Sequence, residues 1–252
     1  MSFDFDPLML KRLAQAKSVV VFTGAGVSQE SGIPTFRDAL TGLWKNFDPN
    51  ELATLEAFDR QPEIVWGWYE FRRAQLLQCA PNPAHLAIAQ LQALQPNVHV
   101  VTQNVDDLHE RAGSSDVIHL HGSIFQTRCR NCHAPFEYTQ TATSVIDAHR
   151  ASPPPSCPEC GGPIRPGVVW FGEMLPEHEW SRAVEVIEQC DVLLSVGTSS
   201  VVYPAAELPF TASENGACVI QINPQTTSLD VVADYNLHGK AGEVLTALVS
   251  SI

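Results

Sequence analysis

The chain has 252 residues, long enough for one large domain, or a large and a small one, with a hydrophobic core of ordinary size. Acidic residues outnumber basic ones 28 to 15 and the few Lys and Arg are scattered, so direct binding to nucleic acid is not expected, because it depends on clustered basic groups. The Met-Ser-Phe-Asp-Phe-Asp start lacks the charged and apolar regions of a secretory signal, and no apolar run reaches the ~20 residues of a membrane span, so we expect a soluble, cytoplasmic protein.

Strands and helices alternate along the chain. Short apolar runs predict strands at residues 18–23, 99–102, 117–120, 192–196 and 218–222. Helical patterns between several of them predict helices at residues 84–94, 176–189 and 205–215. Because the strands are too apolar to have a wet face, they indicate a parallel sheet with helices on both sides. The predicted fold class is therefore α/β, with a Rossmann-like doubly wound parallel sheet.

The first predicted strand leads into a glycine-rich turn, Gly24-Ala25-Gly26-Val27-Ser28. Glycines in such a turn let the backbone bend tightly and bring its N–H groups close to an anion at the start of the next helix. By itself the signal is weak, because a G-x-G-x-x-G fingerprint would need glycine where Gln29 stands, and many glycine-rich turns have no ligand. A dinucleotide phosphate site is one interpretation of this turn.

Two stretches do not fit the alternating pattern, and we expect them to form a smaller inserted domain. One is helical and rich in Trp, at about residues 38–82, and the other contains four cysteines, at about residues 125–168. The Rossmann-like part then comprises about residues 1–37, 83–124 and 169–252.

A helix is predicted after Gln61, because Pro62 suits a first helical position. One helical stripe then contains Val65, Trp68, Tyr69, Arg72 and Leu76. Arg72 therefore lies on the apolar face, where an unpaired charge is unfavourable and an anion is needed. The alternative is an arginine that reaches solvent or pairs within the fold. Its neighbour Arg73 lies about 100° further round, can pair with Glu70, and is predicted to be a solvated surface residue.

Four cysteines form two Cys-x-x-Cys pairs, Cys129/Cys132 and Cys157/Cys160, separated by 24 residues. Such pairs place four thiolates as tetrahedral zinc requires, at about 2.3 Å per Zn–S bond. The alternative is two redox or disulfide pairs, which usually open a helix, whereas these lie in turn-rich polar sequence. Four thiolates leave no position for water, so the predicted zinc is structural. The remaining cysteines, Cys79, Cys190 and Cys218, are predicted to be small buried residues.

Among nine histidines, His121 is the candidate for catalysis. It ends an apolar run and precedes Gly122, so its ring should reach the carboxyl edge of the sheet, where α/β proteins bind ligands. An imidazole with a pKa near ~6.5 can accept a proton at neutral pH. His119, two residues earlier, is interpreted as a packing or hydrogen-bonding histidine.

The string GAGVSQESGIPTFRD, residues 24–38, closely resembles the sirtuin signature. Further segments resemble family motifs in family order and span almost the whole chain: Gln103-Asn104-Val105-Asp106, His121-Gly122, Val168-Val169-Trp170-Phe171-Gly172-Glu173, Gly197-Thr198-Ser199 and Ile222-Asn223.

This resemblance implies NAD as co-substrate and one structural zinc per chain. It implies that the acyl oxygen of a modified lysine attacks the nicotinamide ribose, that His121 activates a ribose hydroxyl, and that nicotinamide, free lysine and O-acyl-ADP-ribose are the products. The implied cofactor-binding residues are Gly24, Ala25, Gly26, Ser28, Thr35, Phe36, Arg37, Gln103, Asn104, Asp106, Gly197, Thr198, Ser199, Asn223, Pro224 and Ala241. Phe36 would shield the reactive carbon from water, although a core aromatic is the alternative, and without the motif Asn104 and Asp106 would be ordinary loop residues.

The resemblance also addresses the choice of acyl group. Tyr69-Glu70-Phe71-Arg72 resembles the Tyr-x-x-Arg motif of sirtuins similar to the mitochondrial desuccinylase and bacterial deacylases, in which these side chains bind the distal carboxylate of succinyl- or malonyl-lysine. Ala53 corresponds to the small residue that widens the acyl pocket in this class, and Val169, Trp170, Phe171 and Gly172 would bind the substrate.

We therefore expect an NAD-dependent protein-lysine deacylase, active on acetyl and on succinyl or malonyl groups, a monomer whose partners are acyl-lysine proteins. The alternative is a non-catalytic, zinc-bearing, NAD-responsive module that binds acyl-lysine. A mono-ADP-ribosyltransferase is a third possibility, in which ADP-ribose ends on protein.

Overall fold

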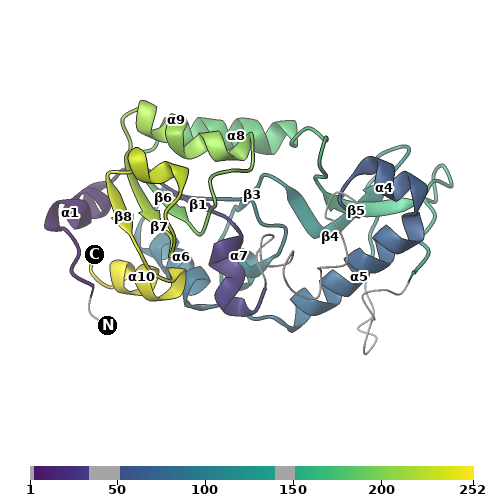
Figure 1. The fold of residues 1–252 in the computed structure, drawn as a ribbon, viewed down its shortest axis with the longest axis horizontal. Helices are drawn as coiled ribbons and strands as arrows, with labels where there is room; N and C mark the ends of the chain where they lie inside the picture. The colour runs from purple at the N-terminus through teal and green to yellow at the C-terminus, as the bar shows by residue number, and fades with distance from the viewer. Residues whose placement is uncertain (1–2, 34–51, 140–150) are drawn as a thin grey trace.

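The computed structural model describes residues 3–33, 52–139 and 151–252, which form a six-stranded and a two-stranded sheet with helices around them (Figure 1). The strands are β1 (Val19–Thr23), β2 (Val98–Thr102), β3 (Ile118–His119), β4 (Gly122–Cys129), β5 (Ile164–Val168), β6 (Val192–Val196), β7 (Cys218–Ile222) and β8 (Tyr235–Leu237). The α-helices are α1 (Pro7–Gln15), α4 (Leu55–Arg60), α5 (Pro62–Gln78), α6 (Pro83–Leu94), α7 (Leu108–Arg111), α8 (Glu177–Glu188), α9 (Leu208–Glu214) and α10 (Ala241–Val249). Three 3₁₀ helices are described, η1 (Ala25–Ser31), η2 (Ala205–Glu207) and η3 (Ser228–Val231).

The six-stranded sheet is parallel throughout, in the order β3-β2-β1-β6-β7-β8. From the central strand β1 the chain builds outward through β2 and β3, and it later returns to β6 on the other side of β1. The strand order thus reverses between β1 and β6, and open α/β sheets bind ligands beyond the carboxyl ends of the strands at this point. All five strands predicted for this sheet are confirmed, whereas β8 has only three partly buried residues and gave no apolar run.

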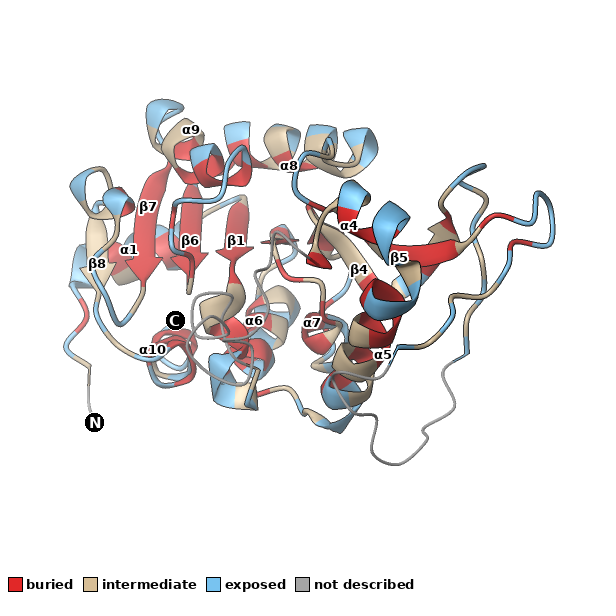
Figure 2. Ribbon diagram, turned by 45° about the vertical axis from the view of Figure 1, so that its right-hand side comes forward, coloured by how far each residue is buried: buried red, intermediate tan, exposed pale blue. Residues whose placement is uncertain are grey.

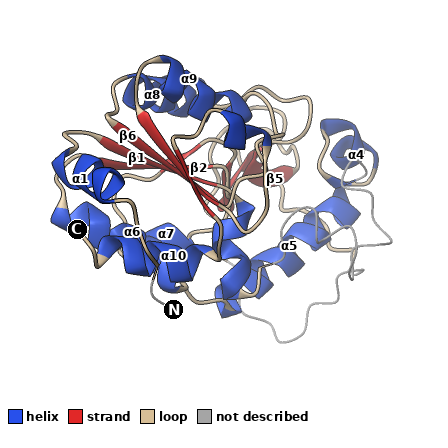
Figure 3. Ribbon diagram, turned by 60° about the vertical axis from the view of Figure 1, so that its left-hand side comes forward, coloured by secondary structure: helices blue, strands red, loops and turns tan. Residues whose placement is uncertain are grey.

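Helices cover both faces of this sheet (Figure 3). Along β1, Val19 and Val21 point into the hydrophobic cluster that includes residues of α1, α6 and α10. Val20 and Phe22 point into the opposite cluster, which includes residues of α8 and α9. This alternation fills one core on each side of the sheet, and it confirms the predicted doubly wound α/β class.

The second sheet pairs β4 and β5 in antiparallel fashion and lies beside α4 and α5, away from α1 and β8 (Figure 1). Residues 168–173, which include the segment expected to bind the substrate, do not form a continuous strand, because β5 ends at Val168 and a turn follows. The small-domain boundaries given above remain our proposal. No helix in the part of the chain that the structure describes is both long and apolar enough to cross a membrane.

Helix α5 is buried on two sides (Figure 2). Its predicted stripe is confirmed, because Val65, Tyr69 and Leu76 join the cluster that also holds Trp170. The prediction that Arg73 is a solvated surface residue is wrong, since this side chain is only 2% exposed. The segment with the cysteines packs on that side of the helix, which the periodicity of a single helix cannot show.

Candidate functional site

The glycine-rich turn after β1 lies against the turn after β6. A Cβ built on Gly26 would come within 2.7 Å of Gly197 Cα, so only glycine allows this approach. Gly197 also has a positive φ of 61°, and the Gly26 N–H donates to the Gly197 carbonyl at 2.9 Å. That N–H is therefore used within the protein, and Gly24 and Gly26 serve close packing of the two turns at the point where the strand order reverses.

Polar side chains from β6, β7 and their loops surround this turn. The Asn223 amide donates to the Thr198 carbonyl at 2.6 Å, and Thr198 itself is buried, with its hydroxyl 3.3 Å from that of Ser200. Ser199 and Pro224 are exposed. Ala241 begins α10, whose first turn is tied to the glycine-rich segment, because the Gly242 N–H donates to Glu30 Oε2 at 2.7 Å.

Ser28 joins the first turn to the loop after β2. Its buried hydroxyl donates to Asp106 Oδ2 at 3.0 Å and accepts from Asn104 Nδ2 at 3.1 Å. Burial raises the pKa of Asp106, while hydrogen bonds from Leu108 and Ser28 act in the opposite direction. The predicted residues Ser28, Asn104 and Asp106 therefore form one hydrogen-bonded group.

His121 lies beside this group with a defined tautomer. Its Nδ1 is 2.8 Å from the Gln103 carbonyl, and because a carbonyl can only accept, Nδ1 carries the proton. Burial lowers the pKa of His121, although the hydrogen bond to Gln103 opposes that effect. The ring is therefore neutral near pH 7, with Nε2 as the unprotonated nitrogen. The next residue must be glycine, since a Cβ on Gly122 would lie 2.1 Å from the Gly167 carbonyl oxygen.

His119 has both ring nitrogens engaged. Nδ1 lies 3.1 Å from the Asn104 carbonyl and Nε2 lies 2.6 Å from Glu110 Oε1. Burial lowers the pKa of His119, but the Glu110 carboxylate and the Asn104 carbonyl outweigh it and the net direction is upward. His119 is thus a hydrogen-bonding residue that holds the loop after β2. Of His119 and His121, His121 is the one with a ring nitrogen able to accept a proton.

The segment expected to bind substrate lies next to His121. The Val169 N–H donates to the His121 carbonyl, and the Phe171 N–H donates to the Ala53 carbonyl, each at 2.9 Å. Phe171 is 47% exposed and Gly172 is exposed as well. Trp170 differs, because it is buried and turned toward α5.

Tyr69 and Arg72 occupy the stripe of α5 that faces this segment. Tyr69 is buried, and its hydroxyl accepts a hydrogen bond from the Trp170 indole N–H at 2.8 Å. The Arg72 guanidinium lies 5.0 Å from the centre of the Trp68 ring. Burial lowers the pKa of Arg72, whereas Tyr69 and Asp106 raise it. Among the described residues, Arg72 has no hydrogen bond or ion pair.

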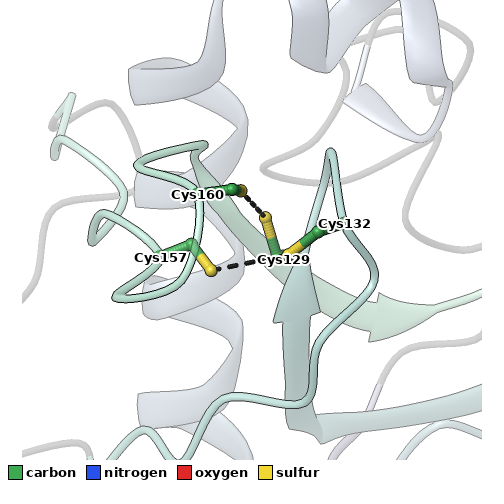
Figure 4. A group of neighbouring side chains, drawn as sticks. All are labelled: Cys129, Cys132, Cys157 and Cys160. Atoms are coloured by element: carbon green, nitrogen blue, oxygen red, sulfur yellow. Dashed lines mark hydrogen bonds between the residues drawn. The ribbon is translucent and has the colours of Figure 1, made fainter.

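The four cysteines converge from the end of β4 with the loop that follows it, and from the loop that precedes β5 (Figure 4). All four sulfur atoms lie within 4.8 Å of one another, with Cys129 and Cys160 at 3.4 Å and Cys132 and Cys157 at 3.6 Å. A tetrahedral zinc ion with bonds of about 2.3 Å needs sulfurs about 3.8 Å apart. The site therefore fits zinc, with all four ligand positions filled by sulfur.

Sequence reasoning missed a pair of buried histidines beneath Ser28. The His85 and His109 rings lie 4.9 Å apart, His85 Nε2 is 3.4 Å from the Ser28 hydroxyl, and His109 Nε2 is 3.0 Å from the Thr23 hydroxyl. Burial lowers the pKa of His85 to about 4 and that of His109 to about 3. Neither residue has a motif around it, and only the fold brings them together. The predicted cofactor-binding residues Thr35, Phe36 and Arg37 lie outside the described residues.

Comparison with known proteins links this arrangement to one family. The model of the Sir2 family matches residues 24–204. The chain is 51% identical over 249 residues to the NAD-dependent protein deacylase of Methylococcus capsulatus, covering 99% of this chain and 98% of that protein. A crystal structure of a Sir2 homolog–NAD complex is similar with a TM-score of 0.89 and 49% identity, covering 99% of this chain and 94% of that one. The structure of Sir2Af2 bound to a myristoylated histone peptide has a TM-score of 0.75 at 39% identity, covering 96% and 93% of the two chains.

Proposed function

The chain belongs to the Sir2 family, and from this premise we propose that it is an NAD-dependent protein-lysine deacylase that also accepts acyl groups with a distal carboxylate. The match to the deacylase of Methylococcus capsulatus covers nearly the whole length of that protein, and one of the similar structures contains an acylated peptide. The non-catalytic alternative is not favoured, because His121 has the tautomer and the depressed pKa of a base.

The turns after β1 and β6 suit a dinucleotide. The close contact between Gly26 and Gly197 lets the two backbones approach, and Thr198 and Asn223 supply polar groups beside them. Bound NAD would supply the ribose that accepts the acyl group. Asn104 and Asp106 would bind the nicotinamide end of NAD, and the hydrogen bonds of Ser28 to both side chains hold them in place. Zinc at the four cysteines would stabilise the loops that follow β4 and precede β5.

His121 would accept a proton at Nε2. The bond from Nδ1 to Gln103 holds the ring in one orientation, so that the basic nitrogen faces away from the loop that binds it. The peptide backbone would run along Val169 and Phe171, whose segment is hydrogen-bonded to His121 on one side and to Ala53 on the other. The proposed products are nicotinamide, free lysine and O-acyl-ADP-ribose.

The surroundings of Arg72 are the observation that supports the proposed activity on acyl groups with a distal carboxylate. Arg72 is a partly buried cation beside Tyr69 that has no ion pair among the described residues. An arginine without a partner in such a place is unfavourable, and a carboxylate on the substrate would pair with it bidentately. Tyr69 lies one helical turn away, on the same face, and can donate to the same group. Succinyl- and malonyl-lysine carry a carboxylate of this kind.

Replacement of Arg72 by Met tests the proposal. The variant loses a charge-assisted contact of roughly 1.5–3 kcal/mol, so we expect kcat/KM for a succinyl-lysine peptide to fall by about one to two decades. Deacetylation of the same peptide sequence should change much less, because an acetyl group has no carboxylate. Nicotinamide release with paired acetyl and succinyl peptides measures both.

Arg60→Met is the matched control, because Arg60 is exposed at the end of α4 and its loss also removes one positive charge. Both activities should stay near wild type in that variant. An unchanged succinyl-to-acetyl ratio in Arg72→Met would rule out the carboxylate contact. Equal loss of both activities would show that Arg72 is needed for the fold instead.

A further inference from the structure

Trp170 is buried within a segment whose neighbours face outward. Its side chain is 2% exposed, whereas Phe171 is 47% exposed. The ring packs against Phe58 with centroids 5.4 Å apart and against Tyr69 at 6.2 Å. Trp170 therefore faces α5, although it lies in the segment expected to contact the peptide.

The indole N–H of Trp170 determines the direction in which the Tyr69 hydroxyl can donate a hydrogen bond. It donates to Tyr69 Oη at 2.8 Å, so one acceptor position of the hydroxyl is filled. Burial raises the pKa of Tyr69, which keeps the hydroxyl protonated at neutral pH. The donor in this contact is the indole, because its nitrogen cannot accept. The Tyr69 proton must therefore point away from Trp170, and within the described residues it has no other acceptor.

The position of the indole is itself fixed by an ion pair. The buried Arg165 guanidinium lies 3.6 Å from the centre of the Trp170 ring and donates to Glu173 Oε1 at 2.5 Å and Oε2 at 2.8 Å. It also donates to the Val168 carbonyl at 2.9 Å, while Glu173 Oε2 accepts from the Trp170 backbone N–H at 2.8 Å. The turn from residue 168 to 173 is thus closed by one bidentate pair, and the ring above it has little freedom.

We propose that Trp170 is a positioning residue for acyl selectivity: its indole N–H orients the Tyr69 hydroxyl so that the Tyr69 proton, together with Arg72, is presented to the distal carboxylate of the acyl group. This inference rests on the proposed carboxylate contact and deepens it. Trp170 does not touch the substrate, and it acts through Tyr69. A phenylalanine in its place would keep a smaller buried aromatic ring and would leave the Tyr69 proton free to turn in other directions.

Trp170→Phe tests this role, because it keeps a buried aromatic ring and removes the N–H. Loss of one oriented neutral hydrogen bond corresponds to about a fivefold lower kcat/KM with a succinyl-lysine peptide. The kcat/KM with the acetyl peptide should fall clearly less, because an acetyl group has no carboxylate to which the Tyr69 proton could be presented. In the Tyr69→Phe background, Trp170→Phe should have no further effect on succinyl selectivity, because the hydroxyl that it orients is gone.

Three outcomes would overturn the inference: equal losses for both peptides, no loss for either, or a selective loss that persists in the Tyr69→Phe background. If Trp170→Phe does not fold, a 3-benzothienylalanine at position 170 keeps the bicyclic shape without the N–H, and the same results are expected. Failure of the proposed function looks different. In that case Arg72→Met and Tyr69→Phe would also leave the succinyl-to-acetyl ratio unchanged.

Discussion

At the scale of single residues, the two histidines on either side of Leu120 differ in what their ring nitrogens contact. His119 is held between the Asn104 carbonyl and the Glu110 carboxylate, an arrangement that favours the doubly protonated ring. His121 is held by one carbonyl, which leaves Nε2 able to accept a proton. The two residues are of the same type, so only the hydrogen-bond partners of each ring distinguish their roles.

The pH dependence of activity should reflect this difference. His121 must be neutral to accept a proton, and burial places its pKa below the ordinary 6.5. We therefore expect kcat/KM to rise with pH through a midpoint below 6.5 and to be near its maximum by about pH 7. Measurement of kcat/KM with an acetyl peptide between about pH 5 and 8 gives the midpoint.

His119→Gln is the control for this profile, since the pKa of His119 is shifted upward. The acidic limb should remain in this variant if it belongs to His121. A midpoint clearly above 6.5 that disappears in His119→Gln would assign the limb to the wrong histidine and contradict our account.

At the scale of elements, helix α5 connects the proposed acyl site with the zinc module. Next to Tyr69 on this helix, the Arg73 guanidinium pairs with Glu70, donates to the Ile124 carbonyl at 2.7 Å and lies 4.7 Å from the centre of the Trp66 ring. Trp66 belongs to the cluster that holds Cys129 and Cys157. Arg73 therefore belongs to the packing of the fold, whereas its neighbour Arg72 belongs to the proposed acyl site.

Arg73→Met should therefore destabilise the protein strongly. Removing one member of the buried Arg73–Glu70 ion pair costs about 3–5 kcal/mol. Arg72→Met is the matched comparison one residue away. It breaks no ion pair among the described residues, so its cost should be much smaller. Denaturant unfolding gives the free energy of unfolding of both variants, and the zinc content of each is measured alongside. Equal destabilisation of the two variants would contradict the separate roles of the two arginines.

The features that were predicted correctly from the sequence are those that a local residue pattern specifies. Apolar runs predicted five of the six strands of the large sheet, namely β1, β2, β3, β6 and β7. The spacing of the cysteines predicted a cluster that the structure brings within 4.8 Å. The short β8 and the end of β5 at Val168 carry no such pattern. The burial of Arg73, the His85–His109 pair and the Arg165–Glu173 pair depend on segments that meet only in the fold, so their partners could not be predicted from spacing.

At the scale of the whole molecule, the site combines parts from distant segments. The glycine-rich turn, the loop after β2, His121 and the turn after β6 meet where the order of the parallel strands reverses. Helix α5 and the turn after β5 bring the side chains of the proposed acyl site to the same region, through the contacts of Val169 with His121 and of Tyr69 with Trp170. The cytoplasmic location, the monomeric state and the lack of nucleic-acid binding stay predictions.

The most direct test of the account is the mass of the products formed from NAD and a peptide that carries one succinyl- or acetyl-lysine. We expect one nicotinamide and one free lysine for each ADP-ribose that gains the acyl group, with no reaction of the unmodified peptide. The His121→Ala variant should keep its zinc and form these products about 10²–10⁴-fold more slowly. Peptide binding without release of nicotinamide would contradict the account, and so would the appearance of ADP-ribose on the peptide or on the protein.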